Sequence, residues 1–173
     1  KASMLNMKNN EITRGESVDM CDNVTSYVSS KTGMLDSGRR AIFIDGLTAD
    51  GKLQTEIIYY RYSGLQNPMQ LRSEKLLPLC TRPAGYYSED MDGDGDVEIP
   101  STSPMVGYEN AVADEMLYMT TWSVYEDFYD LKTKYTGYYA ISDGYFVTFP
   151  KRWNSSVTVK KDSDTNELVF YKY

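Results

Sequence analysis

The apolar residues of the chain fall in short runs of β-formers separated by turn sequences, and long runs with helical spacing are scarce, so the pattern predicts antiparallel hairpins more clearly than any helix. Residues 40–45 and 53–62 are rich in Ile, Phe and Tyr, and they flank Ala-Asp-Gly-Lys at 49–52, which is typical of a tight turn. A hairpin over residues 40–62 is therefore the first element that we expect. Residues 24–30 have the composition of a shorter strand before it.

The last third of the chain shows the same pattern. Residues 137–141 and 145–149 flank the turn sequence Ser-Asp-Gly, and further strands are expected at 157–161 and 168–173. We therefore predict two successive hairpins in this region.

The segment between these regions can be interpreted in two ways. Strands at residues 116–125 and 129–139 are expected on either side of Glu126 and Asp127. The alternative is a helix over residues 111–134. Its aromatic residues do not fall on one helical face, so the strands are favoured.

The remaining segments carry weak patterns. Pro68 precedes a stretch that fits one or two helical turns between residues 67 and 78. The other segments are expected to be a loose lead-in (1–23), a loop (33–38), an extended stretch (79–87), a Ser/Thr/Pro linker (100–104) and an irregular segment (108–114). We expect the boundary between the two halves of the chain to lie in this irregular segment.

Composition supports strands. The 173 residues include 16 tyrosines, and Tyr, Val, Ile, Phe, Trp and Thr favour pleated, half-buried surfaces. We predict an all-β fold of antiparallel hairpins, arranged like propeller blades or as a sandwich, with little helix. Two regions are expected, residues 1–104 and 105–173, with one continuous domain as the alternative.

Residues 88–100 contain the one chemically specific pattern in the sequence. Acidic residues stand at every second position, namely Asp90, Asp92, Asp94, Asp96 and Glu98. Because so many like charges in one turn repel each other, we expect a cation to hold them. Calcium is the natural candidate, since it takes six to eight hard oxygen ligands in flexible geometry.

The spacing matches a calcium loop, which has ligands at positions 1, 3, 5, 7 and 9 and a glycine at position 6. Counting Asp90 as position 1 puts Gly95 at position 6 and Glu98 at position 9. The helix–loop–helix version needs a glutamate at position 12, where this chain has a serine directly after Pro100. We therefore expect the loop to lead into a strand at residues 97–99.

Residues 90–99 resemble the Asp-x-Asp-Gly-Asp-Gly-x-x-(Asp/Glu)-Ile/Leu loop of FG-GAP repeats, the calcium-binding blades of integrin-α-like β-propellers. The resemblance implies side-chain oxygens from Asp90, Asp92, Asp94 and Glu98 as calcium ligands. It implies only the backbone carbonyl from Asp96. The alternative is an acidic surface turn that holds no ion.

The hairpin at residues 40–62 contains a weaker version of this loop. Asp-Gly at 50–51 precedes Glu56 much as Asp-Gly at 94–95 precedes Glu98. The two glutamates are 42 residues apart, within the roughly 40–50 residues of a propeller blade. The earlier version lacks alternating aspartates and should not hold a metal. Chance similarity between two such turns is the alternative.

A wider resemblance covers residues 40–173. Gly-Tyr-Phe-Val-Thr-Phe-Pro-Lys-Arg-Trp at 144–153 and a following Val-Thr-Val strand are similar to uncharacterised surface lipoproteins of Gram-positive bacteria, which carry the same Asp-Gly-Asp-Gly-x-x-Glu-Ile-Pro phrase upstream. The resemblance implies a cell-surface protein. Because the chain begins at Lys1 and ends within a predicted strand, we expect a mature or trimmed piece of a larger product.

Charge and composition exclude several classes of function. The net charge of −7 argues against nucleic acid and anionic membrane surfaces as partners. No apolar run is long enough for a transmembrane helix. The absence of histidine excludes Ser-His-Asp and Cys-His catalysis and histidine-ligated metals. Cys21 and Cys80 form no C-x-x-C motif, so a disulfide and two free thiols are both open.

Two alternative functions use residues outside the loop. A pair of carboxylates could hydrolyse glycosides without histidine, although the acids outside the loop also fit solvated surface charge. These acids are Glu109, Glu115, Glu126 and Asp127. Trp122 and Trp153 could form a sugar-stacking platform with the tyrosines, although core packing explains them more simply.

Together these patterns predict a non-enzymatic binding module with a structural calcium ion and no catalytic residues. A loop with millimolar affinity for calcium fills only outside the cytosol, so an extracellular or cell-surface location is expected. The expected partner is a protein or a glycan at the cell surface. The alternatives are a carbohydrate- or cell-wall-binding module and a glycosidase-like enzyme.

Overall fold

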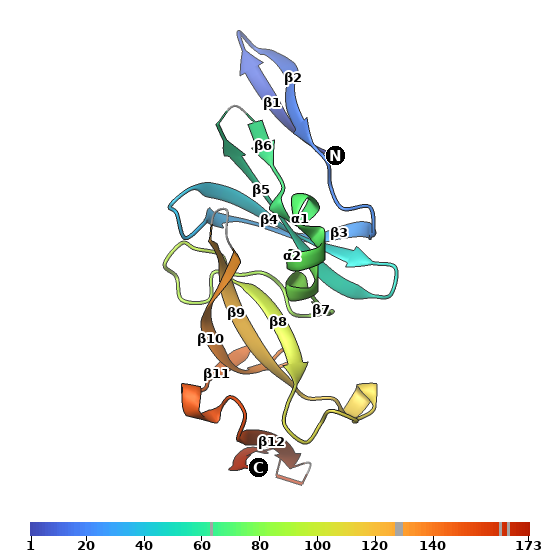
Figure 1. Cartoon of the computed structure of the whole chain (residues 1–173), viewed down its shortest axis with the longest axis vertical. Helices are drawn as coiled ribbons and strands as arrows, with labels where there is room; N and C mark the ends of the chain where they lie inside the picture. Colours follow the sequence, from blue (N-terminus) through green and yellow to red (C-terminus); the bar gives the residue numbers. More distant parts are fainter. Residues whose placement is uncertain (63, 127–129, 163, 166) are drawn as a thin grey trace. The chain divides into compact units, whose positions relative to one another are not determined.

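The computed structural model describes residues 1–62, 64–126, 130–162, 164–165 and 167–173 (Figure 1). These residues fold into two compact units. The first unit contains Lys1–Pro100 and Ser123–Lys132, and the second contains Ser101–Trp122 and Thr133–Tyr173. The division predicted after residue 104 assigns residues 123–132 to the later region, whereas the structure groups them with the first unit.

The first unit is built on an antiparallel sheet. Its neighbouring strands are β3 (Val24–Met34), β4 (Arg40–Thr48), β5 (Lys52–Arg61) and β6 (Gly64–Gln66), and β7 (Thr81–Pro83) also pairs with β5. The predicted hairpin over residues 40–62 is confirmed as β4 and β5. The predicted strand at 24–30 lies within β3. The loop predicted at 33–38 begins too early, because Gly33 and Met34 still pair with β4.

Successive side chains of β4 and β5 point to opposite sides of this sheet, which therefore has two different faces. On one face Phe43, Ile57 and Tyr59 are buried in the core of the first unit. Met69, Leu76 and Cys80 cover that face from the helical segment that follows β6. Full burial of one such side chain contributes about 1.5–3 kcal/mol, so the packing of this face stabilises the sheet.

Two short helices follow β6, as predicted for residues 67–78. α1 (Pro68–Leu71) begins after Asn67, whose side chain accepts a hydrogen bond from the Met69 amide at 3.2 Å. α2 (Ser73–Cys80) runs two residues further than expected. The stretch predicted as extended from residue 79 therefore becomes extended only at β7.

The lead-in predicted at residues 1–23 is wrong. Most of it forms an antiparallel hairpin of β1 (Ala2–Lys8) and β2 (Glu11–Val18). Asn9 and Asn10 connect the strands with φ angles of 52° and 63°, as a type I′ turn requires. Both faces are largely exposed, so the segment carries no apolar alternation; the Asn-Asn pair was the available signal.

A second sheet has the strand order β11-β10-β9-β8. It contains β8 (Ile99–Pro104), β9 (Tyr118–Glu126), β10 (Asp130–Ala140) and β11 (Tyr145–Thr148). The strands predicted at 116–125 and 129–139 are confirmed as β9 and β10, so the alternative helix over 111–134 is wrong. Asp127 and Tyr129 lie outside the described residues. The antiparallel pair of β10 and β11 confirms the hairpin predicted around residues 142–144.

The linker predicted at residues 100–104 is also wrong, because these residues belong to β8. Pro100 and Pro104 suggested a break, since proline cannot donate a hydrogen bond within a sheet. β8 is the last strand in the order of its sheet, and a strand at an edge tolerates prolines whose nitrogen points outward.

The second unit has a core of its own, formed by Met105, Phe149 and Val159 with partly buried aromatic residues around them. β12 (Val157–Asp162) and β13 (Glu167–Lys172) pair as an antiparallel hairpin, as predicted. Two single 3₁₀ turns, Ala113–Glu115 and Lys151–Trp153, occupy loops.

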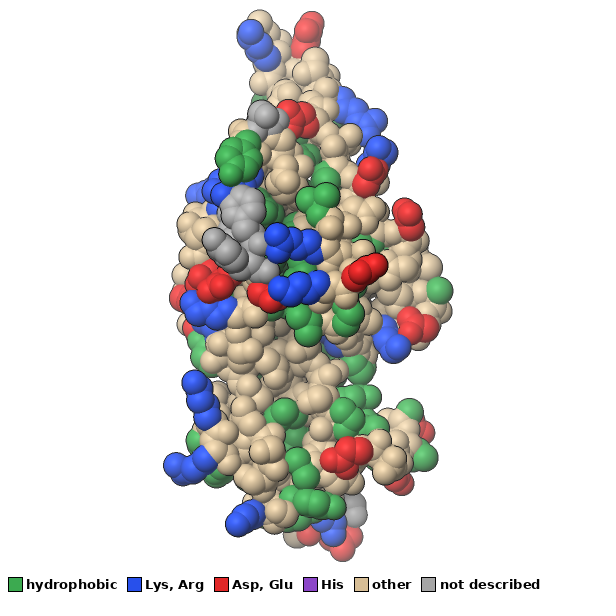
Figure 2. Space-filling view, in the orientation of Figure 1, with side chains coloured by type: hydrophobic (Ala, Val, Ile, Leu, Met, Phe, Trp, Pro, Cys, Tyr) green, Lys and Arg blue, Asp and Glu red, His purple; other side chains and the backbone are tan. Residues whose placement is uncertain are grey.

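The predicted all-β class, with antiparallel hairpins and little helix, is confirmed. Within the described ranges the strands form one five-stranded, one four-stranded and two two-stranded sheets, which is not the repeated four-stranded sheet of propeller blades. In the same ranges, no helix has the length and apolar character that crossing a membrane demands. Figure 2 shows acidic and basic side chains mixed over the face that it draws.

Cys21 and Cys80 are buried free thiols, and burial raises the pKa of each to about 12. The thiolate is the reactive form, so both should resist a disulfide-exchange reagent in the folded protein and react once guanidinium chloride unfolds it. An unfolded thiol ionises near pH 9.0, so the unfolding free energy should fall as the pH rises from there towards 12. A Cys21→Ala/Cys80→Ala variant should show a shallower fall in urea titrations. Rapid reaction of the folded protein would contradict the assignment.

Candidate metal site

A buried ion pair fixes the segment that leads into the acidic loop. Arg82 on β7 and Asp45 on β4 approach to 2.8 Å between Nη2 and Oδ1, and neither side chain is more than 2% exposed. Asp45 also accepts hydrogen bonds from the amide and the hydroxyl of Ser88, at 2.8 and 2.9 Å. Because a buried carboxylate is costly to leave without partners, these contacts fix Ser88 two residues before Asp90.

Backbone hydrogen bonds close the loop at its two ends. The amide of Glu89 donates to the carbonyl of Glu98 at 3.1 Å, and the amide of Glu98 donates to the carbonyl of Glu89 at 2.9 Å. The carbonyl of Gly95 accepts from the amide of Met34 at 2.8 Å, which attaches the loop to the end of β3. The loop therefore has a fixed frame that does not depend on its own carboxylates.

Asp90 shapes the interior of the loop. Its two carboxylate oxygens accept hydrogen bonds from the amides of Gly93 at 2.7 Å and Gly95 at 3.0 Å. These glycines have φ angles of 76° and 93°, in the left-handed region that disfavours other residues. The two glycines of the motif thus allow the chain to turn tightly around one aspartate.

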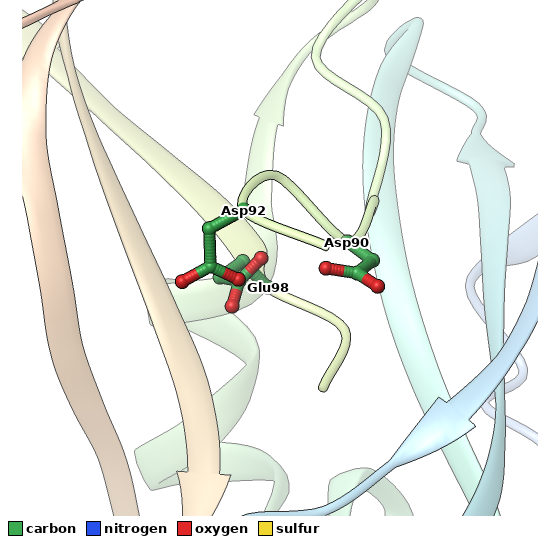
Figure 3. A group of neighbouring side chains, drawn as sticks. All are labelled: Asp90, Asp92 and Glu98. Atoms are coloured by element: carbon green, nitrogen blue, oxygen red, sulfur yellow. The ribbon is translucent and has the colours of Figure 1, made fainter. Parts of the chain in front are cut away.

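Three carboxylates come together in this loop. Asp90, Asp92 and Glu98 each offer one oxygen, and these three oxygens lie within 4.8 Å of one another. Figure 3 shows the carboxylate groups of Asp92 and Glu98 side by side, with that of Asp90 directed towards them. Asp92 is exposed, Asp90 is half-buried and Glu98 is fully buried. Three negative charges at this spacing repel each other, so a hard cation among them would be stabilising.

The other two acids of the predicted set have different surroundings. Asp94 is exposed, and its side chain accepts a hydrogen bond from the amide of Asp96 at 2.9 Å. The oxygens of Asp94 and Asp96 are not part of the group of three. Their predicted roles as ligands therefore stay predictions. Glu98 is held by a contact that the spacing did not indicate, a hydrogen bond from the amide of Met91 at 2.8 Å.

The weaker version of the loop uses its acids differently. Asp50 accepts a hydrogen bond from Thr48 at 2.6 Å and forms an ion pair with Lys52 at 2.8 Å. The hydrogen bond from Lys52, followed by that from Thr48, lowers the pKa of Asp50 to about 2. Glu56 is buried in β5 and accepts from the amide of Cys21 at 2.8 Å. Asp50 is thus held by its neighbours in the turn, whereas Glu56 is held by a donor 35 residues away in the sequence.

The acids considered for glycoside hydrolysis have the surroundings of surface charges. In the second unit, Glu109 accepts hydrogen bonds from the amide of Gly107, and Glu115 is exposed in a 3₁₀ turn. In the first unit, Glu126 lies 3.7 Å from the ammonium group of Lys132. Asp127 is outside the described residues. The structure gives this alternative no support.

The two tryptophans lie in the second unit. Trp122 is completely buried and packs edge-on against Tyr139 and Phe146, with ring centroids 5.6 and 6.1 Å apart. Trp153 is half-buried beside Phe149, at 5.7 Å. A sugar-stacking platform needs exposed aromatic faces, so these positions count against that role.

Comparison of the chain with family models, curated proteins and solved structures gave no match. The resemblances to FG-GAP loops and to Gram-positive surface lipoproteins therefore stay predictions. Any assignment of function depends on the geometry of the loop.

Proposed function

We propose that residues 90–98 bind one calcium ion, and that this ion fastens the loop in a non-enzymatic binding module at the cell surface or outside the cell. The observation that carries the proposal is the convergence of Asp90, Asp92 and Glu98 within a loop that is closed by backbone hydrogen bonds. The ion would offset the repulsion among the carboxylates.

The chemistry of the loop favours calcium over other metals. Its donors are hard oxygens in an irregular arrangement, which calcium accepts, whereas magnesium demands near-octahedral geometry. Zinc and copper sites usually include histidine or cysteine, and this chain has no histidine. Asp94, the Asp96 carbonyl and water would complete the six to eight ligands of the ion.

Calcium should stabilise the protein by mass action. At a concentration ten times the dissociation constant, the gain is about 1.4 kcal/mol, which corresponds to roughly 3–5 °C in the melting temperature of a chain of this size. Thermal melting with calcium and with a chelator measures this shift. An unchanged midpoint at millimolar calcium would remove the proposal.

The Asp92→Ala variant tests the ligands themselves. It should lose the calcium-dependent shift, and its melting temperature in chelator should not fall, because Asp92 is exposed and its removal relieves repulsion with Asp90 and Glu98. Asp143→Ala is a matched control, since Asp143 is an exposed aspartate in the turn between β10 and β11. This control should keep the full response to calcium. An equal response in both variants would place the ion elsewhere.

The affinity tests the proposed location. Extracellular calcium modules have dissociation constants of about 10⁻⁴ to 10⁻³ M, and calorimetry should give a value in that range. Such a site would fill at the cell surface, where a protein or a glycan would be the partner. A submicromolar constant would instead favour a cytosolic calcium sensor or buffer.

A further inference from the structure

The face of the first sheet that lies opposite the core of the first unit carries its own apolar surface. Ile42 on β4 is paired with Ile58 on β5, and Tyr60 on β5 is paired with Leu65 on β6. Residues paired across neighbouring strands point to the same face, so these four side chains lie together. Ile42 and Tyr60 remain 43% and 45% exposed, which leaves much of this surface open.

A pocket of about 550 Å³ lies over these side chains. Ile42, Ile58, Tyr60, Leu65 and Met34 form its apolar wall. Sites for small organic ligands usually measure about 300–1,000 Å³ and combine an apolar wall with a few polar groups. The size and the lining therefore suit a small molecule.

Arg40 supplies the charged group of this pocket. It lines the pocket and is exposed, and it has no hydrogen-bond or ion-pair partner within the described residues. In β4 it stands two residues before Ile42, so both point to the same face. A guanidinium group without a partner beside an apolar wall favours a ligand with one anionic group, which it can hold by charge-assisted hydrogen bonds.

The acidic loop borders the same pocket. Gly95 is one of the lining residues, and its carbonyl accepts the hydrogen bond from Met34. The loop packs closely on β3, because a Cβ atom on Gly33 would come within 2.5 Å of the Val97 side chain. Without a cation the aspartates on either side of Gly95 would repel an anionic ligand. A bound calcium ion would reduce that repulsion.

We propose that this pocket binds a small organic anion, with its apolar body on Ile42, Ile58 and Tyr60 and its anionic group on Arg40. Calcium in the loop tightens the binding of such an anion. The second statement rests on the proposed function, whereas the first does not. The ligand is thus a free small molecule with one carboxylate, sulfonate or phosphate group.

Two fluorescent probes separate the contributions of the apolar body and the charge. 8-Anilinonaphthalene-1-sulfonate carries a sulfonate, and N-phenyl-1-naphthylamine is the same ring system without it. In chelator, Arg40→Met should weaken binding of the sulfonate roughly tenfold and leave the neutral probe unchanged. Ile42→Asp should weaken binding of both probes. Tyr60→Ala should also weaken binding of both probes. It tests the apolar wall independently if the Ile42→Asp variant does not fold.

Matched variants away from the pocket serve as controls. Arg152→Met removes an exposed arginine of the second unit, and Leu5→Asp changes a 66% exposed leucine on β1. Both should bind the two probes as the unchanged protein does. Equal weakening by Arg40→Met and Arg152→Met, or no weakening by Ile42→Asp and Tyr60→Ala, would overturn the pocket.

Calcium gives an independent comparison. It should tighten binding of the sulfonate probe and leave the neutral probe unchanged, and Asp92→Ala should abolish that effect. Binding that depends on Arg40 and Ile42 but not on calcium, in a protein that calcium stabilises, would overturn the coupling alone. Absence of any calcium response in melting scans would overturn the proposed function and the coupling. The pocket itself is tested independently, by the binding of the two probes in chelator.

Discussion

Replacing Arg82 by methionine is expected to lower the free energy of unfolding by about 3–5 kcal/mol, because the change leaves the carboxylate of Asp45 buried without its cation. Arg82 also donates to the backbone carbonyls of Tyr86 at 2.6 Å and Cys80 at 2.7 Å. These acceptors would lose a charge-assisted hydrogen bond as well. Urea unfolding followed by circular dichroism measures the difference.

A double-mutant cycle isolates the ion pair from the other contacts. Arg82→Met with Asp45→Leu removes both charges, so the double variant should cost less than the sum of the two single changes. Ser88 loses the acceptor for its amide in that variant, and the calcium-dependent shift should shrink. If Arg82→Met alone cost less than about 1 kcal/mol, the pair would be comparable to a solvated one and could not fix the start of the loop.

Trp122→Ala is expected to have an effect of similar size, about 3–5 kcal/mol, because it empties a fully buried site in the second unit. The rings of Tyr139 and Phe146 would lose their edge-on neighbour. Trp122→Phe should cost less, since the indole Nε1 has no hydrogen-bond partner among the described residues and phenylalanine carries no such donor. Chemical unfolding followed by far-ultraviolet circular dichroism measures both changes.

Trp153→Ala is the comparison for a half-buried ring and should cost roughly half as much as Trp122→Ala. The sugar-binding alternative predicts another outcome, in which both tryptophan variants keep the stability of the unchanged protein and lose affinity for a cell-wall glycan.

The hairpin of β4 and β5 could be predicted because two signals agreed there. Runs of apolar and aromatic β-formers marked the strands, and a Gly-containing turn separated them. The hairpin of β1 and β2 offered only a turn signal, the Asn-Asn pair at residues 9–10. Leu5, Met7 and Ile12 are exposed, so burial placed no constraint on which residues of that hairpin are apolar. Hydrophobic periodicity arises where one face of a strand is buried, so an exposed hairpin does not show it.

The candidate site could also be predicted only in part, although for a different reason. Spacing alone placed Asp90, Asp92 and Glu98 in one loop, because the ligands of such a loop are close in sequence. The frame around them depends on contacts across long stretches of chain. Asp45 and Arg82 are 37 residues apart, and neither belongs to a motif. A buried ion pair of that kind follows from the fold and could not be inferred beforehand.

The prolines of β8 have a consequence for self-association. The amide of Met105, directly after β8, donates inward to the carbonyl of Leu117, so the nitrogens of residues 100, 102 and 104 point away from β9. Two of these three positions are proline and have no N–H. A strand from another molecule would find a single donor there instead of a continuous row, which makes this edge a poor template for aggregation.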